Sequence, residues 1–377
     1  ILSTFASQNE SKQSMKLNDI AEFVTDKISS SSISLDRYVT TDSLLQNRRG
    51  REIAQNLPPV PCALTHYKQG DVLVANIRPY LKKVWYADSE GGCSSDVLVF
   101  RAKNGHCPSF LYTVLMQDAF FDHAMSGAKG SKMPRGDKDQ IMRYELPTFT
   151  PTEEENIGNM MVDIMSKIKV NRQINDNLEA MAKQLYDYWF VQFDFPNEEG
   201  KPYKSSGGAM VYNEKLKREI PQGWHCYELN KWLEIKSGFA FKSETYISKG
   251  KFKVVTIKNV QDHHLDTSSC DYVYEIPQGM KEWCSLSVND RLISLTGNCG
   301  RLCIVTEKDL LLNQRVGLLA CNDEYIDYAY LLLSSEEYHT LSNNLAKGAA
   351  QANLSPVDLC KNIAVLPKLD VLEKFNR

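Results

Sequence analysis

The sequence lacks the signatures of several large classes of protein. No stretch approaches the ~20 consecutive apolar residues that a membrane-spanning helix needs. Residues 1–14, which we expect to be an extension outside the folded part, have neither the basic start nor the apolar core of a signal peptide. None of the ten cysteines forms a CxxC pair, and several lie in apolar stretches. We therefore expect no membrane segment, and we expect the cysteines to be buried thiols in a reducing compartment.

Motifs of catalytic and cofactor sites are also missing. The sequence contains no GxxxxGKS or GxxxxGKT loop, no GxGxxG between a strand and a helix, no GxSxG and no HExxH. His263, His264, Cys270, Cys299 and Cys303 match no standard zinc spacing. The net charge of −3 argues against a protein that coats DNA unaided, although it does not exclude local basic grooves. These absences favour a binding or recognition protein, with no catalytic residue and no metal of its own, over an enzyme.

The longest predicted element is a helix over residues 151–196. Pro151 presets φ, and Thr152 with the three glutamates after it places acceptors and negative charge at the helix N-terminus. Pro196 ends the helix, which would span roughly 60 Å. An apolar stripe with coiled-coil spacing, interrupted at Asn171, consists of Ile157, Met161, Ile164, Ile168, Ile174, Leu178, Met181 and Leu185. We expect this stripe to contact a helix of this chain, of a second copy or of another subunit. The alternative is a core helix of one large domain.

The predicted elements on either side of this helix repeat in the same order at a shift of roughly 220 residues. Each copy has a turn pair before a strand, at Gly70–Asp71 or Asn289–Asp290, and closes on a Leu-Pro pair, at Leu146–Pro147 or Leu366–Pro367. The predicted fold class is α/β (α+β), with two similar mixed α/β domains separated by the long helix. The expected parts are the extension 1–14, the first domain 15–150, the helix 151–196, a polar linker 197–219, the second domain 220–368 and the start of a second long helix at 369–377.

Three stretches within these domains have helical spacing of their apolar residues. They are residues 15–24, 110–125 and 224–235. We expect a helix over each of them.

Polar and basic residues occupy corresponding loops of the two domains. Arginine, lysine, asparagine and glutamine are the side chains that reach phosphates and base edges of DNA. The candidates in the first domain are Arg78, Tyr80, Lys82, Lys83, Lys129, Lys132, Arg135 and Lys138, with a further run at Arg48, Arg49 and Arg51. Those in the second domain are Lys258, Asn298, Arg301, Asn313, Gln314, Arg315, Gln351 and Asn353. Solvated loops are the simpler interpretation of any one residue, but the repetition on two domains favours DNA contact.

Several segments resemble the specificity (S) subunit of a type I restriction–modification system. They are the loops with their Leu-Pro ends, GAKGSKMPRGDKDQIMRYELP and GAAQANLSPVDLCKNIAVLP; the stretch after the first, EEENIGNMM to FDFPNEEGKPYKSSGG; and EIPQGW with SGFAF at the start of the second domain. The resemblance covers nearly everything after Met15 and rests on the order of these segments. It implies two target recognition domains, each reading one half of a split sequence in double-stranded DNA, held apart by antiparallel helices.

The same resemblance implies partners. Methyltransferase (M) subunits would dock on the helices and a restriction (R) subunit would join them, in the cytoplasm of a bacterium or archaeon. S-adenosylmethionine, ATP and magnesium would then belong to the partners and not to this chain. The family pattern also contains a second long helix, most of which is missing here, so we expect either a truncated or phase-variable form or a chain that borrows a helix from another chain, for example by self-association. Two alternatives remain open: a self-contained modification–restriction enzyme and a non-catalytic adaptor that binds protein through its duplicated modules.

Overall fold

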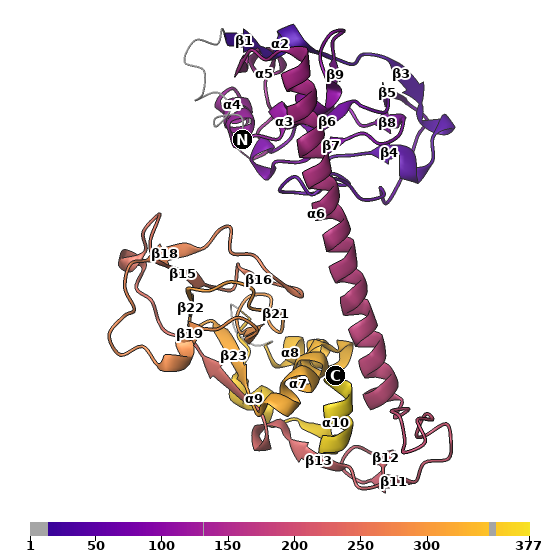
Figure 1. The fold of residues 1–377 in the computed structure, drawn as a ribbon, viewed down its shortest axis with the longest axis vertical. Helices are drawn as coiled ribbons and strands as arrows, with labels where there is room; N and C mark the ends of the chain where they lie inside the picture. The colour runs from indigo at the N-terminus through magenta and orange to yellow at the C-terminus, as the bar shows by residue number, and fades with distance from the viewer. Residues whose placement is uncertain (1–13, 131, 347–351) are drawn as a thin grey trace. The chain divides into compact units, whose positions relative to one another are not determined.

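The computed structural model describes residues 14–130, 132–346 and 352–377. Contacts divide the chain, inside its longest helix, into a first unit (Ile1–Asn175) and a second unit (Asp176–Arg377) (Figure 1). Each unit is a mixed α/β structure with two four-stranded sheets. No helix in the described parts of the chain is long and apolar enough to cross a membrane.

The first unit is built on an antiparallel sheet in the order β2-β9-β6-β7. Its strands are β2 (Ala21–Phe23), β9 (Val97–Ala102), β6 (Val72–Ala75) and β7 (Val84–Tyr86). A second sheet, in the order β3-β5-β8-β4, contains β3 (Lys27–Ser29), β5 (Ala63–Tyr67), β8 (Gly91–Cys93) and β4 (Tyr38–Val39). The pair β1 (Ser14–Lys16) and β10 (Glu145–Pro147) closes the unit. Helices α2 (Leu17–Ile20), α3 (Pro108–Leu115), α4 (Asp118–Ser126) and α5 (Lys138–Met142) complete it.

The second unit repeats this plan. Its first sheet, β14-β23-β20-β21, contains β14 (Glu234–Ser237), β23 (Val316–Ala320), β20 (Arg291–Ser294) and β21 (Leu302–Ile304). Its second sheet, β18-β15-β22-β19, contains β18 (Asp271–Val273), β15 (Phe252–Val255), β22 (Leu310–Leu312) and β19 (Ser285–Leu286). The pair β13 (His225–Glu228) and β24 (Ile363–Leu366) matches β1 and β10. The helices are α7 (Asp323–Ser334), α8 (Glu336–Leu345), α9 (Pro356–Cys360) and α10 (Leu369–Phe375). Two short hairpins, β11 (Met210–Asn213) with β12 (Arg218–Pro221) and β16 (Val260–Gln261) with β17 (His264–Leu265), are added.

The second sheets of the two units differ at their edges. Each contains one parallel pair, β4 with β8 in the first unit and β15 with β22 in the second, flanked by an antiparallel neighbour of β8 or β22. The first unit adds its fourth strand, β3, beside β5. The second unit adds β18 on the opposite side, beside β15. The edge formed by β18 therefore has no counterpart among the described residues of the first unit.

The long helix α6 runs from Pro151 to Tyr186, 36 residues or about 54 Å, and continues as a single π-helical turn over Asp187–Val191. It is thus shorter than the predicted 151–196. Thr150 caps it: the Glu153 N–H donates to the Thr150 hydroxyl (3.3 Å), and the Thr150 N–H donates to the Glu153 carboxylate (2.8 Å). The predicted acceptor at Thr152 is one of the exposed residues of the first turn.

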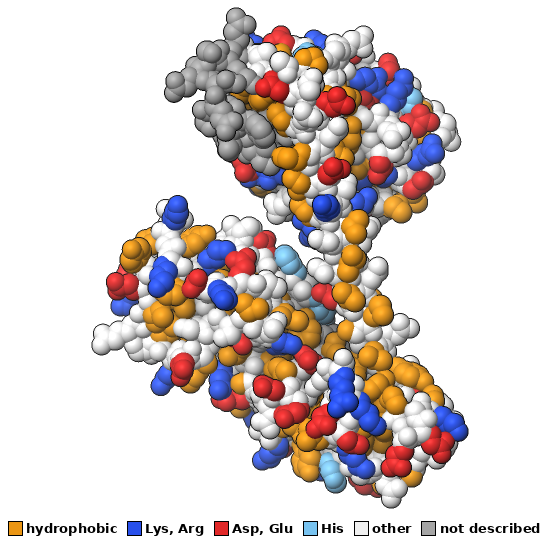
Figure 2. Space-filling model, viewed as in Figure 1, with side chains coloured by type: hydrophobic (Ala, Val, Ile, Leu, Met, Phe, Trp, Pro, Cys, Tyr) orange, Lys and Arg blue, Asp and Glu red, His pale blue; other side chains and the backbone are white. Residues whose placement is uncertain are grey.

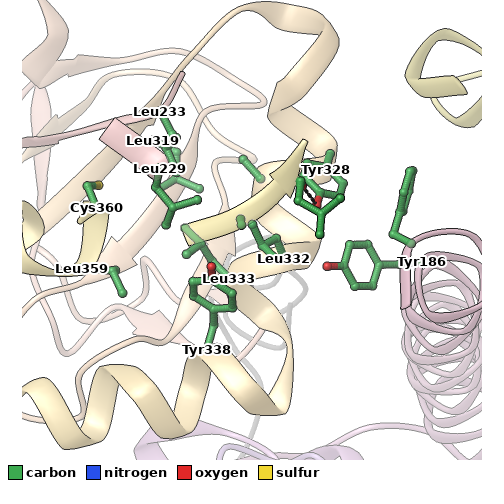
Figure 3. Close-up of a cluster of buried hydrophobic side chains, with 14 of the residues drawn as sticks. Tyr186, Leu229, Leu233, Leu319, Tyr328, Leu332, Leu333, Tyr338, Leu359 and Cys360 are labelled. Carbon is green, nitrogen blue, oxygen red and sulfur yellow. Dashed lines mark hydrogen bonds between the residues drawn. The ribbon is translucent and has the colours of Figure 1, made fainter. Parts of the chain in front are cut away.

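The two ends of α6 are buried in different cores. At its start, Ile157 packs with α3 and α4 in the core of the first unit, and the Glu154 carboxylate, 1% exposed, accepts from the Cys107 N–H (3.1 Å). At its end, Tyr186 lies in the core of the second unit and points toward Tyr328 and Leu332 of α7 (Figure 3). Hydrophobic burial therefore secures both ends of the helix.

Three predicted helices are wrong in part. Residues 15–24 form β1, α2 and β2, and residues 224–235 form β13, a 3₁₀ turn and the start of β14. Pairing of β1 with β10 and of β13 with β24 overrides the local helical spacing, because short segments gain more from tertiary contacts than from propensity. The stretch 110–125 divides into α3 and α4 at Met116 and Gln117, where the backbone of Gln117 is extended.

Candidate nucleic-acid interface

Three loops of the first unit meet where β6 ends. The loop after β6 contacts the Gly-rich loop through the Arg78 N–H, which donates to the Pro134 carbonyl (2.8 Å), and through a bridge between Ile77 and Arg135. On its other side, the Arg48 N–H donates to the Lys82 carbonyl (2.9 Å). Backbone hydrogen bonds therefore bring the arginine run, the loop after β6 and the Gly-rich loop together. We call this arrangement the first loop junction.

The backbone of the first loop junction is strained at its cationic residues. Arg48, Arg78 and Lys82 all have positive φ, between 51° and 60°, although none is a glycine. Such conformations cost of order 1–3 kcal/mol each and persist only where surrounding contacts enforce them. The strain turns these backbone segments in directions that an ordinary loop would not take, which is typical of binding sites.

The side chains of the first loop junction differ in how freely they could meet a ligand. The exposed Arg78 guanidinium has no carboxylate partner among the residues that the structure describes, and Tyr80 is 49% exposed. Lys132 is also exposed. Arg135 contacts Asp96 at 3.0 Å and Lys129 contacts Asp137 at 3.2 Å. Both are surface ion pairs, which contribute little to stability and can be exchanged for a phosphate.

Four further cations that we predicted as DNA contacts have structural partners. Lys82 and Arg48 both bind the carboxylate of Asp118, and these hydrogen bonds lower the pKa of Asp118. Lys83 donates to the Thr41 carbonyl (2.5 Å), and the Lys138 ammonium lies 5.8 Å from the centroid of the Phe23 ring. These side chains hold the loops in place.

The second unit has an equivalent second loop junction where β20 ends. The Gly297 N–H donates to the Ala352 carbonyl (3.0 Å), and Thr296 bridges Asn353 as Ile77 bridges Arg135. The Leu295 N–H donates to the Arg315 carbonyl (2.9 Å), which adds the loop between β22 and β23. The register places Asn353 at the position of Arg135. The residues two places further on, Ser355 and Asp137, both cap the helix that follows, which supports this register.

Four of the candidates in the second unit are exposed and have no partner carboxylate among the residues that the structure describes. Asn298, Gln314, Arg315 and Asn353 are exposed in the structure. By contrast, Arg301 is tied to Gln261 (2.9 Å) and Asp262 (3.5 Å), and Lys258 is tied to Asp271 (3.1 Å). Gln351 lies outside the described residues.

The prediction that Asn313 contacts DNA needs correction. Asn313 is only 8% exposed, and its side-chain oxygen accepts the backbone N–H of Arg315 (3.1 Å). The side chain therefore forms an Asx turn that shapes the loop, because asparagine readily binds its own backbone two residues on. Its exposed neighbours Gln314 and Arg315 present the polar groups instead.

Most of the apolar stripe on α6 is exposed. Ile164, Ile174, Leu178, Met181 and Leu185 range from 38% to 64% exposed. Ile168 and Met161 are half-buried. Ile157 is buried in the core of the first unit and is therefore not available to another helix, contrary to its predicted place at a subunit interface.

The cysteines are free thiols in the described residues, and most of them are buried. Burial raises the pKa of Cys303 to about 12, so this thiol stays protonated at neutral pH. No group of three or more histidine, cysteine or acidic side chains that could hold a metal ion occurs in the part of the chain that the structure describes.

Comparison with known proteins finds similarity to one family, and the family model matches the second unit. Residues 221–369 match the family model described as "Type I restriction modification DNA specificity domain". The MjaIX specificity subunit of Methanocaldococcus jannaschii is 25% identical over 201 residues, which are 53% of this chain and 44% of that subunit. The chain is therefore similar to type I specificity subunits over part of its length. This finding confirms the resemblance that we inferred from the loops and their Leu-Pro ends.

Further relatives support the family and the fold. The HindI specificity subunit of Haemophilus influenzae is 24% identical over 164 residues, which are 42% of this chain and 36% of that subunit. A solved S subunit from M. genitalium has a TM-score of 0.55 and 14% identity, with 97% of this chain and 88% of that chain covered, so it shares the fold. The two α/β units and the long helix predicted from the sequence are thereby confirmed. The matched regions span less than half the length of these curated relatives.

Proposed function

We propose that the chain is the DNA-recognition subunit of a type I restriction–modification complex, and that each unit reads one half of a split target in double-stranded DNA. The observation that carries this proposal is the recurrence, in both units of a single chain, of one junction between the loop after β6 or β20 and the polar loop before α5 or α9. In each unit the bridged pair, Ile77 with Arg135 or Thr296 with Asn353, lies at the end of the equivalent strand. A split target requires two such readers joined in one molecule.

The side chains at the junctions suit contact with DNA. In the first unit, Arg78 and Arg135 have the planar fork that binds a phosphate or the O6 and N7 of guanine through two hydrogen bonds. In the second unit, Asn353 and Asn298 have the amide group that pairs with the N6 and N7 of adenine. Recognition is thus the role of this chain, and it supplies no catalytic group. S-adenosylmethionine, ATP and magnesium would be bound by partner subunits.

The helix α6 would serve as the spacer between the two readers. Its 36 residues are continuous. The exposed apolar stripe, centred on Leu178 and Met181, is a surface that loses water when it meets another helix. We assign this surface to docking of the methyltransferase subunits or of a second copy of the chain. The restriction subunit would join that assembly.

Methylome sequencing tests the proposal. A host expressing the chain with its methyltransferase subunit should carry methylation at a split motif. Replacing residues 224–367 with the equivalent segment of a related subunit should change one half of that motif and leave the other half unchanged, because each unit carries its own junction. A reciprocal replacement of residues 15–147 serves as the matched control and should change only the other half. Simultaneous change of both halves in either exchange would refute the two-reader proposal.

A protein-binding adaptor gives a different result in the same strains. If the chain were such an adaptor, exchange of either domain would alter which proteins co-purify with it. It would leave no sequence motif in the methylome.

A further inference from the structure

A groove at the edge of the second sheet in the second unit has no role in the DNA recognition that we propose for the loop junctions. It has a volume of about 800 Å³ and is lined by Lys249, Gly250, Lys251 and Phe252 on one side and by Tyr274, Glu275 and Ile276 on the other. The two lysines are exposed and have no carboxylate partner among the described residues. Tyr274, with 72% of its surface exposed, is the most exposed large hydrophobic side chain recorded in the structure. The Lys251 ammonium lies 5.0 Å from the centroid of the Phe252 ring and stays exposed to solvent. Two cations without a carboxylate partner beside an exposed aromatic ring are typical of a nucleic-acid-binding surface.

The groove is built by the edge strand that only the second unit has. β15 and β18 pair in antiparallel register with Phe252 opposite Val273, so the residues that line the groove continue directly from the ends of these two strands. A Cβ atom at Gly250 would lie 2.7 Å from the Val273 carbonyl oxygen, so glycine is needed for the close approach of the two segments. The first unit adds its fourth strand on the opposite side and does not build this edge.

The second unit has a reason to hold additional cations. At equivalent positions of the loop junctions, Asn353 replaces Arg135 and Gly297 replaces Arg78. Arg301 is tied to Asp262, which leaves Arg315 as the exposed cation of the described second loop junction. Amide side chains can read base edges, but only cations supply the attraction to phosphates that dominates the affinity for DNA. Cations outside the described part of this junction would therefore add phosphate contacts in this unit.

A series of contacts connects the groove to the reading loops. Phe239 bridges Asn313, and its carbonyl accepts the Gln314 N–H (2.9 Å). The Phe239 ring lies 5.2 Å from the Phe241 ring, which stacks on Tyr246 at 6.4 Å. Tyr246 is three residues from Lys249. Figure 2 shows Lys and Arg side chains together with hydrophobic ones over the part of the second unit that carries β15 and β18.

We propose that this groove binds the sugar–phosphate backbone of DNA beside the half-site read by the second unit. The ammonium groups of Lys249 and Lys251 would each bind a phosphate, and the ring of Tyr274 would pack against a sugar or base edge. Glu275, on the same wall, would weaken the attraction and limit binding to unrelated sequences. The inference rests on the proposed function and extends it, because it adds a surface that contacts DNA without reading the bases.

The salt dependence of DNA binding tests the groove. We would measure anisotropy of a fluorescein-labelled duplex of scrambled sequence with the full chain, over a series of salt concentrations. The double variant Lys249→Ala, Lys251→Ala should flatten the slope of log K against log salt by about two units, since each lost phosphate contact removes about 0.9. The matched control, Lys215→Ala with Lys231→Ala, removes two exposed lysines of the same unit and should leave the slope unchanged.

Two further variants distinguish a loss of contact from a loss of folding. Glu275→Gln removes a negative charge and should raise the affinity for the duplex several-fold, which an unfolded variant cannot do. Tyr274→Leu should weaken binding several-fold, whereas Tyr274→Phe should retain it, because packing against a deoxyribose needs the flat ring and not the hydroxyl. If the wild-type chain binds with a steep salt dependence and the lysine double variant matches it, the groove assignment is overturned and the proposed function stands. If the wild-type chain shows no salt-dependent binding, both are overturned.

Discussion

The close packing of α6 against α3 predicts how a single added methyl group at Gly158 changes stability. Gly158 lies inside α6, where glycine is unfavourable relative to alanine by ~1 kcal/mol. A Cβ atom at this position would lie 2.2 Å from the Ser109 hydroxyl oxygen and 2.5 Å from the Phe110 backbone nitrogen. The Ser109 side chain can rotate away, but the Phe110 backbone lies in the first turn of the buried helix α3 and cannot move alone. Gly158→Ala must therefore push α6 away from α3.

The two effects of Gly158→Ala have opposite signs. Alanine gains ~1 kcal/mol of helix propensity. Overpacking of a tight contact costs typically 1–3 kcal/mol. We expect a net loss of up to about 2 kcal/mol in the stability of the first unit, because the backbone clash is too short for ordinary side-chain adjustment. The loss should be local to α3 and the first three turns of α6, where Ile157 and Glu154 are buried.

Amide hydrogen exchange measured by mass spectrometry separates this loss from changes elsewhere. Peptides covering residues 107–116 and 151–165 should exchange faster in Gly158→Ala, and peptides of the second unit should not change. The control Ser166→Ala also introduces an alanine into α6, but at an exposed position. It should slow exchange slightly, because alanine is a better helix former than serine. If Gly158→Ala slows exchange as Ser166→Ala does, the close packing of α6 on α3 is refuted.

Three further predictions concern recognition and assembly. A four-residue insertion at Asn171 lengthens α6 by about 6 Å and should widen the gap between the half-sites by one or two base pairs, at ~3.4 Å per pair, in the methylome; an unchanged gap with retained methylation would mean that α6 does not set the distance. Arg78→Ala and Arg135→Ala should each weaken binding, either at all sequences with a salt slope shallower by about one, or at one base position by about 1–3 kcal/mol; wild-type affinity and slope in both would remove them from the interface. Leu178→Glu with Met181→Glu should leave the thermal stability of the isolated chain within about 0.5 kcal/mol, because both side chains are exposed, and should abolish co-purification with the methyltransferase subunit; retained co-purification would place docking elsewhere.

The duplication was predictable because it rests on the order of the elements and on the turn residues between them. The turn pairs before β6 and β20, and the Leu-Pro pairs that close β10 and β24, occur at matching places in the sequence and in the structure. The polar loops that precede α5 and α9 were predicted to correspond. The bridges of Arg135 with Ile77 and of Asn353 with Thr296 show the same correspondence. Turns marked by glycine and proline in the sequence are found in the structure because they depend on local backbone geometry.

The functions of single polar side chains were less predictable. Asn313 and Arg315 are both polar residues of one loop, yet one is buried in an Asx turn and the other is exposed. Lys82 and Arg78 are both cations after β6, yet only Lys82 binds Asp118. Sequence spacing does not reveal these differences, since Asp118 comes from α4, 36 residues further along the chain. Partners from distant segments decide which charges remain available to a ligand.

The sequence by itself determined the long helix, the repeat of two α/β units and the resemblance to type I specificity subunits. Helical periodicity and the order of turns are local properties, and they persist however the chain folds around them. Only the tertiary structure decided that residues 15–24 and 224–235 are largely strands, and that β18 extends the second sheet on the side opposite to β3. Strand pairing joins residues that are far apart in sequence, so the edge on which a strand is added depends on the whole sheet. The groove beside β18 follows from that choice.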